Sequence, residues 1–107
     1  MTDADAHALV LTTAGTRHEA EAIAEVLLER RLAACVQLVT IDSAYRWEGE
    51  VVRDAEVLLL IKTRADRYDE IESTIVEVHS YDTPEVVLLP VSAGLPAYLA
   101  WIDESTT

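Results

Sequence analysis

The five apolar residues Val57-Leu-Leu-Leu-Ile61 decide how this sequence folds. They close a longer run, Val51 to Thr63, whose apolar and β-branched residues predict a strand. In an antiparallel sheet with one face in water, every second residue of such a strand should be polar. Neither face of this run is polar near its end, and Val86 to Leu89 shows the same pattern. The sequence therefore predicts a sheet that is covered on both faces.

The remaining segments supply neighbours for this strand. Further strands are predicted at 7–13, at 34–41 with an extended continuation over 43–47, and at 86–91, and helices at 16–31, 66–78 and 95–102. Glu48-Gly49-Glu50 is expected to form a hairpin turn. The order is βαββαβ followed by a C-terminal helix. This order is typical of an α+β, ferredoxin-like sandwich, in which both crossover helices lie on one side of an antiparallel sheet.

Local signals indicate where the helices begin and which faces they bury. Thr16 and Glu19 form a capping-box pattern at the start of the first helix, and Arg30 and Arg31 are expected in its last turn. Asp66 is expected to cap the second helix. The helical spacing predicts inward faces made of Tyr68, Ile71, Ile75 and Val78 in the second helix, and of Leu95, Leu99 and Ile102 in the last.

The two-sided apolar strands favour an oligomer. Two helices can cover only one face of the sheet, and an uncovered apolar face favours association. The terminal helix, with about eight residues and a length of roughly 12 Å, is short for covering the other face alone. We therefore expect a second copy of the chain to cover it. The alternative, in which the terminal helix is sufficient, stays open at this point.

Length and charge limit the class of protein. The 107 residues predict one domain over residues 7–107, preceded by a disordered tail at 1–6. The net charge of −12 argues against DNA or RNA as partners, because phosphates require a basic surface. The single cysteine excludes an intrachain disulfide, and neither a signal-peptide pattern nor an apolar run of membrane-spanning length is present. We expect a cytoplasmic protein without a membrane segment.

The residues that could carry chemistry are few. No catalytic triad and no glycine-rich phosphate loop is found, so we do not expect an enzyme. Cys35 lies between apolar neighbours and is expected to be a shielded structural thiol. His79 is expected either to cap a helix or be exposed to solvent, or to bind metal weakly. Lys62, the single lysine, is either an anion anchor or the partner of Glu85 or another acidic residue in an ion pair.

Five strings of the sequence, read together, resemble the CutA family of divalent-cation tolerance proteins over roughly residues 8–103. They are Leu32-Ala33-Ala34-Cys35-Val36, Tyr45-Arg46-Trp47-Glu48-Gly49, Ile61-Lys62-Thr63, His79-Ser80-Tyr81-Asp82-Thr83-Pro84-Glu85 and Tyr98-Leu99-Ala100-Trp101-Ile102. The resemblance implies a ferredoxin-like protomer, a homotrimer and a link to divalent-metal tolerance, chiefly of copper. It also implies a cleft between subunits lined by Trp47, Lys62, Tyr81, Glu85, Tyr98 and Trp101.

The sequence departs from this family at its metal positions. Thr12 stands where copper-linked members carry a cysteine, Val78 stands where they carry a second histidine, and Ser80 replaces a proline. His79 and Cys35 remain as candidate ligands for Cu²⁺ or another divalent cation. Copper(II) prefers imidazole and carboxylate donors, so weak binding should depend on His79 more than on Cys35. The alternative function is a trimeric sensor similar to PII proteins, with a small ligand in the clefts between subunits.

Overall fold

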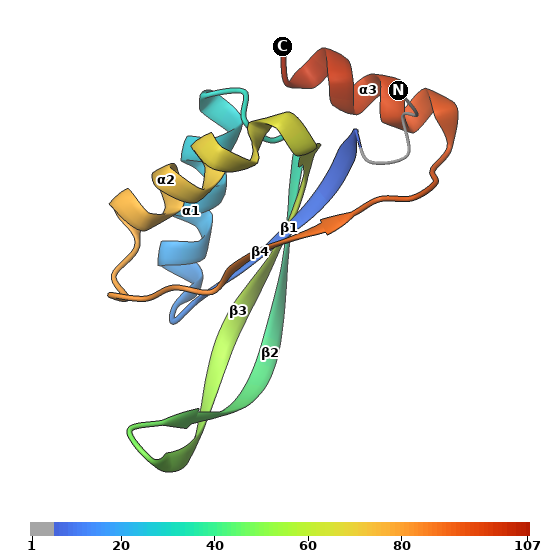
Figure 1. Cartoon of the computed structure of the whole chain (residues 1–107). Coiled ribbons are helices and arrows are strands. Elements are labelled where there is room, and N and C mark those ends of the chain that lie inside the picture. Colours follow the sequence, from blue (N-terminus) through green and yellow to red (C-terminus); the bar gives the residue numbers. More distant parts are fainter. Residues whose placement is uncertain (1–5) are drawn as a thin grey trace.

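The computed structural model describes residues 6–107, so most of the tail predicted at 1–6 lies outside the described residues. Four strands form one antiparallel sheet in the order β2-β3-β1-β4, and α1 and α2 lie together on one side of it (Figure 1). The expected α+β, ferredoxin-like sandwich with a C-terminal helix is confirmed. The elements are β1 His7–Ala14, α1 Arg17–Glu29, β2 Cys35–Trp47, β3 Glu50–Arg64, η2 Ala65–Arg67, α2 Tyr68–Val78, β4 Val86–Pro90 and α3 Pro96–Ser105.

The face of the sheet that α1 and α2 cover contains the core. Val10 of β1 pairs with Ile61 of β3, and Thr12 pairs with Leu59, and all four side chains are buried. The inner faces of the helices complete the cluster, with Ile23 and Leu27 of α1, and Ile71 and Ile75 of α2. Burying one such aliphatic side chain stabilises the fold by roughly 1.5–3 kcal/mol.

The first helix begins as predicted but ends earlier. The hydroxyl of Thr16 accepts a hydrogen bond from the Glu19 amide at 3.1 Å. Arg30 and Arg31, expected in the last turn, lie beyond the helix, because α1 ends at Glu29. Arg31 has a φ of 58°, a left-handed conformation that turns the chain toward β2.

The second helix begins two residues later than predicted and ends at Val78, as predicted. Asp66 does not cap it, because Asp66 lies inside η2, where its carboxylate is 3.3 Å from the Arg64 guanidinium. Val78, expected on the inner face, is exposed, whereas Thr74 is buried. Ile71, Thr74 and Ile75 follow the i, i+3, i+4 spacing of one face, and Val78 ends the helix outside the covered area.

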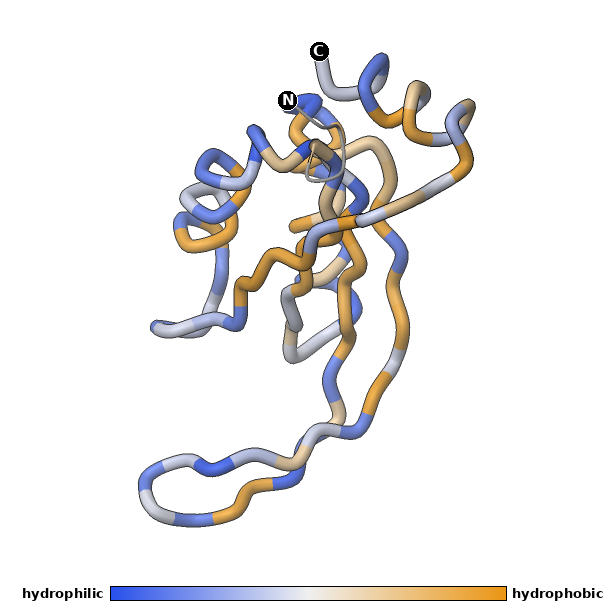
Figure 2. The backbone as a smooth tube through the Cα atoms, turned by 45° about the vertical axis from the view of Figure 1, so that its right-hand side comes forward, coloured by the Kyte–Doolittle hydropathy of each residue, from blue (hydrophilic) through white to orange (hydrophobic). Residues whose placement is uncertain are grey.

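The opposite side of the sheet, which we call the open face, is apolar and incompletely covered. Side chains alternate between the two faces along each strand. The apolar residues whose positions belong to the open face are Leu9, Leu11, Val39, Ile41, Leu58, Leu60, Val87 and Leu89. Val39 is 46% exposed, Val87 45% and Leu89 43%. Figure 2 shows the hydrophobic stretches running along the strands. The two-sided apolar pattern of the sequence is therefore real, and the chain covers only one of the two sides.

The second half of β2 and the first half of β3 project from the sheet as a two-stranded arm (Figure 1). The arm comprises residues 41–47 and 50–56, since β3 pairs with β1 only from Val57 onward. Its turn is Glu48 and Gly49, with φ values of 50° and 82°, which suits a type I′ hairpin, and Glu50 belongs to β3. The arm explains the radius of gyration of 14.5 Å, above the roughly 13 Å of a compact domain of this length. A two-stranded ribbon has little stability alone.

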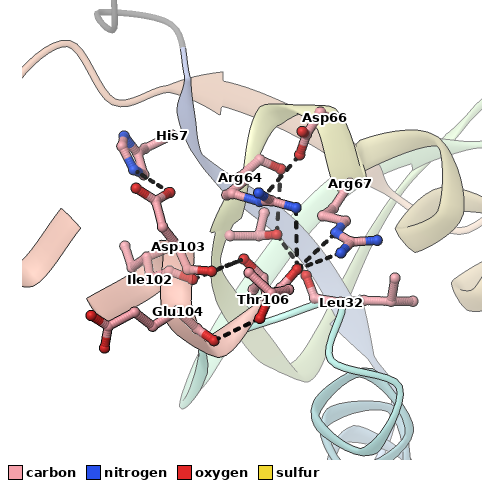
Figure 3. A network of polar contacts seen from close by, with 11 residues as sticks. His7, Leu32, Arg64, Asp66, Arg67, Ile102, Asp103, Glu104 and Thr106 are labelled. Atoms are coloured by element: carbon pink, nitrogen blue, oxygen red, sulfur yellow. Dashed lines mark hydrogen bonds and ion pairs between the residues drawn. The ribbon is translucent and has the colours of Figure 1, made fainter. Parts of the chain in front are cut away.

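Polar contacts fix α3 at one end of the sheet, where β1 begins and β3 ends (Figure 3). His7 Nε2 lies 2.9 Å from Asp103 Oδ1, and Arg64 and Arg67 donate hydrogen bonds to the Thr106 carbonyl. Arg31 donates to the carbonyls of Glu104 and Thr107. These donors satisfy the free carbonyls at the end of the helix.

The position of α3 determines which side chains it buries. Ile102 is buried as predicted, but Leu95, expected to face inward, is 70% exposed because it precedes the first turn of α3. Since Val39, Val87 and Leu89 stay exposed, α3 covers only the end of the open face near His7 and Lys62 and leaves the rest uncovered. Within residues 6–107, none of the helices has the length and hydrophobicity needed to cross a membrane.

Candidate functional site

The loop from residue 79 to residue 85 is held against α1 by one carboxylate. Glu19 accepts hydrogen bonds from the Ser80 amide at 2.8 Å and from the Ser80 hydroxyl at 3.0 Å. Partial burial is the largest single influence on Glu19 and disfavours its charged form, but the two bonds from Ser80, with smaller contributions from other neighbours, together lower the pKa of this carboxyl below 4.5. A proline at position 80 would have neither donor.

His79 is buried and both of its ring nitrogens are engaged. Nε2 lies 2.7 Å from the Thr13 carbonyl, which can only accept, and Nδ1 lies 3.0 Å from the Tyr81 amide, which can only donate. The imidazole therefore carries its proton on Nε2, and its lone pair on Nδ1 accepts from Tyr81. The side chain is 0% exposed. A metal ion could bind this histidine only after displacing the Tyr81 amide.

A cavity of about 600 Å³ lies between the arm and the 79–85 loop. It brings together three of the six predicted cleft residues, Trp47, Tyr81 and Glu85. The complete lining is Thr13, Ser43, Ala44, Tyr45, Trp47, Glu56, Tyr81, Asp82, Thr83 and Glu85. The lining thus combines three aromatic rings with three carboxylates.

Two tyrosine hydroxyls at this cavity donate to carboxylates of β3. Tyr81 donates to Glu56 at 3.1 Å, and Tyr45 donates to Asp54 at 2.6 Å. Burial and the bond to Glu56 raise the pKa of Tyr81 to about 12, and the bond to Asp54 raises the pKa of Tyr45. Both hydroxyls therefore keep their protons at neutral pH.

Tyr45 and Glu56 were not among the residues singled out from the sequence. The signal that could have found Tyr45 is the alternation along β2, which places it two residues from Trp47 and on the same face. Glu56 required the register of the hairpin, which pairs it with Ile41.

The other three predicted cleft residues form a second cluster, near α3. The ammonium of Lys62 lies 3.5 Å from the Tyr98 hydroxyl and 5.6 Å from the centroid of its ring. The rings of Tyr98 and Trp101 are 5.6 Å apart. Among the described residues, no carboxylate lies within ion-pair distance of Lys62, so the ion pair with Glu85 considered from the sequence does not form.

The candidate metal ligands do not converge within one chain. Cys35 pairs with Lys62, which pairs with Leu9, whereas His79 binds Thr13, four residues or about 13 Å further along β1. Cys35 is only half-buried, so the chain by itself does not shield it as predicted. In the described part of the chain, no group of three His, Cys, Asp or Glu side chains could hold a metal ion.

Comparisons with known proteins agree with this architecture. Residues 8–105 match the family model of the CutA1 divalent ion tolerance protein. The chain is 43% identical over 99 residues to the divalent-cation tolerance protein CutA of Thermus thermophilus, which covers 92% of this chain and 96% of that protein.

Solved structures give the same result. The periplasmic divalent cation tolerance protein CutA of Archaeoglobus fulgidus superposes with a TM-score of 0.93 at 39% identity, covering 94% of this chain and 99% of that chain. CutA1 of Oryza sativa superposes with a TM-score of 0.93 at 37% identity, over 99% and 98% of the two chains. This chain therefore belongs to the CutA1 divalent ion tolerance protein family.

Proposed function

We propose that this protein acts as a homotrimer in the response to divalent metal ions, binding Cu²⁺ weakly and catalysing no reaction. The observation that carries the proposal is the division of the cleft residues into two clusters. Trp47, Tyr81 and Glu85 lie at the arm, and Lys62 and its aromatic neighbours lie by α3. Only contact between copies would bring the two clusters into one cleft.

The open face supports the trimer. Three of its apolar side chains, Val39, Val87 and Leu89, are close to half-exposed in the single chain, and the others are only partly buried. Such a patch favours association. Cys35 lies on this face, opposite Lys62. In the trimer, a thiol reagent should label Cys35 much more slowly than it labels the denatured protein. Equal rates for the folded and denatured protein at micromolar concentration would contradict this arrangement.

Weak copper binding follows from the donors available. Cu²⁺ prefers imidazole and carboxylate ligands, and His79 has Glu19 4.0 Å from its Nδ1. Coordination at Nδ1 would cost the hydrogen bond from Tyr81, about 1 kcal/mol. Calorimetric titration with Cu²⁺ should therefore show weak binding that His79→Ala reduces and Cys35→Ser leaves unchanged. Tight binding that survives His79→Ala and is lost in Cys35→Ser would identify the cysteine as the ligand instead.

The second candidate function is a trimeric small-molecule sensor similar to PII proteins. The cavity of about 600 Å³ at the base of the arm favours it, because its size is typical of ligand pockets. Titration with nucleotides, zinc and copper separates the two functions. Binding of a nucleotide without binding of metal would favour the sensor.

We propose the cytoplasm as the location. The single cysteine, which forms no disulfide within the chain, is compatible with a reducing compartment. The similar Archaeoglobus protein is called periplasmic, so the two locations are the alternatives to test. Fractionation of source cells should find the protein with cytoplasmic markers; recovery with periplasmic markers would contradict the proposal.

A further inference from the structure

The open face carries an ammonium group at one end and a carboxylate at the other. Lys62 of β3 is in register with Leu9 of β1, which is in register with Leu89 of β4, and this row lies at the end next to α3. Glu85 precedes Leu89 by four residues and lies at the opposite end, beside the arm. Alternation gives Glu85 the same face as Leu89. The rows between the two charges are mainly apolar and include Leu11, Leu58, Leu60 and Val87.

The two charges cannot reach each other within one chain. In the part of the chain that the structure describes, neither Lys62 nor Glu85 takes part in an ion pair. The register places them about 13 Å apart along the strands and two strand spacings, roughly 10 Å, apart across them. A lysine side chain is too short to span this separation. An ion pair between the two residues therefore needs two copies of the chain.

Covering the open face would make both charges costly unless they meet opposite charges. A second copy removes water from the side chains that it covers, and a charge that loses water without gaining a counter-charge destabilises the complex. We infer that the Lys62 ammonium of one copy binds the Glu85 carboxylate of the next copy. This inference rests on the homotrimer proposed above and specifies a contact that joins its subunits.

An assembly of three copies can pair every such lysine. The contact joins one end of an open face to the other end of the next, so it is heterologous, and heterologous contacts form a closed ring when the rotation closes. Each copy then donates one Lys62 and receives one. In a ring of three, no Lys62 and no Glu85 is left without a partner.

Glu85 is a better acceptor than the other carboxylates at its end of the face. Glu56 already accepts a hydrogen bond from Tyr81 at 3.1 Å. Asp82 lies in the loop, three residues before Glu85, and outside the alternation that Glu85 shares with Val87. The Lys62 of a neighbouring copy would therefore find the free carboxylate at Glu85.

Exposed aromatic rings lie near both charges. Tyr98 and Trp101 are next to Lys62 and are 38% and 42% exposed, and Trp47, which lines the same cavity as Glu85, is 57% exposed. Tyrosine and tryptophan are enriched at the centres of interfaces, where they exclude water from polar pairs. Contact between copies would bury these rings around the ion pair.

Chemical cross-linking tests the contact directly, because Lys62 is the single lysine of the chain. A carbodiimide joins an amine to a carboxylate in contact with it and adds no spacer. The native protein should give covalently linked chains on a denaturing gel, and mass spectrometry should find peptides that join Lys62 to Glu85. Lys62→Arg keeps the charge but lacks the reactive amine, so the link should disappear while the native mass is unchanged.

Exchange of the two charges measures what the contact contributes to assembly. Lys62→Glu and Glu85→Lys should each raise the concentration at which the assembly half-dissociates by roughly tenfold or more, because like charges then face each other. The double variant should recover most of the loss. Glu29→Lys, on the exposed end of α1, is the matched control. Combined with Lys62→Glu, it restores the net charge of the wild type and should not restore assembly.

The outcomes separate this contact from the trimer itself. A trimer that neither charge change weakens, or whose linked peptides join Lys62 to a different carboxylate, would overturn the ion pair and leave the trimer standing. Rescue of Lys62→Glu by Glu29→Lys would also overturn it, because net charge alone would then control assembly. A dimer containing the link from Lys62 to Glu85 would support the ion pair and contradict the trimer. A wild-type mass of one chain would contradict both.

Discussion

The two faces of the sheet carry similar apolar residues but differ in how far the chain buries them. On the side of α1 and α2, Leu59 and Ile61 are fully buried by the chain's own helices. On the open face, Val39, Val87 and Leu89 are close to half-exposed, although they belong to the same sheet. The difference indicates that the chain encodes two apolar surfaces for two purposes. One builds the core of the protomer, and the other is suited to contact with further copies.

Truncation of neighbouring leucines on opposite faces should have the largest effect, and a different one on each face. Leu59→Ala should lower the free energy of unfolding by about 2–5 kcal/mol, because it leaves a cavity in the core. Leu60→Ala should instead shift dissociation of the oligomer to higher protein concentration and leave the folded subunit more stable than Leu59→Ala does. Urea denaturation and sedimentation equilibrium measure the two effects. If both changes destabilised the subunit equally and neither affected assembly, the two faces would not differ in the way described.

Two buried threonines on the covered face differ in their hydrogen bonding. The hydroxyl of Thr63 donates to the Leu32 carbonyl at 2.6 Å, whereas the hydroxyl of Thr12 is buried and has no hydrogen-bond partner among the described residues. Thr63→Val should therefore destabilise the protein by about 1–2 kcal/mol, and Thr12→Val should stabilise it by about 1 kcal/mol. Thermal unfolding of the two variants should show a lower melting temperature for Thr63→Val and a higher one for Thr12→Val than for the wild type. A loss of stability in Thr12→Val would mean that its hydroxyl is paired.

The contact between Glu19 and the 79–85 loop should make the stability of the protein depend on pH, by less than the effects above. The pKa of Glu19 is lower in the folded protein than its usual value of 4.5, so the charged form stabilises the fold. This contribution is complete above pH 4.5 and is lost as the pH falls through the folded pKa. Glu19→Gln should lower stability at pH 7 by about 1 kcal/mol and reduce its loss below pH 4.5.

Glu25→Gln on the exposed side of α1 is the control for this measurement. It removes the same charge and makes none of the contacts to Ser80. If the stability of Glu25→Gln falls with decreasing pH in the same way as that of Glu19→Gln, the lowered pKa of Glu19 has no consequence for folding.

The order and topology of the elements could be predicted because each depends on local pattern. Alternation and apolar runs indicated the strands, and the unbroken run at 57–61 predicted that both faces of the sheet need cover. Asp66 was wrong as a cap because its carboxylate is near Arg64 and the helix begins two residues later. Leu95 was wrong as an inward residue because it precedes the first turn of α3, which begins at Pro96, so the helical spacing does not apply to it.

The candidate site was harder to predict. The resemblance placed Trp47, Lys62 and Tyr98 in one cleft, yet one chain holds the first far from the other two. A sequence does not state which copy contributes which residue. The contribution of Glu56 depended on the register of the hairpin, and the engagement of His79 depended on a carbonyl of another strand. Both are long-range properties of the fold.

The mass of the native protein in solution shows directly whether other copies of the chain cover the open face. Multi-angle light scattering at micromolar concentration should give about three times the 11.8 kDa of the single chain. Val87→Asp, which places a charge on the half-exposed open face, should reduce that mass while circular dichroism remains native-like. A wild-type mass of one chain would contradict the account, because the open face and the arm would then need no second copy.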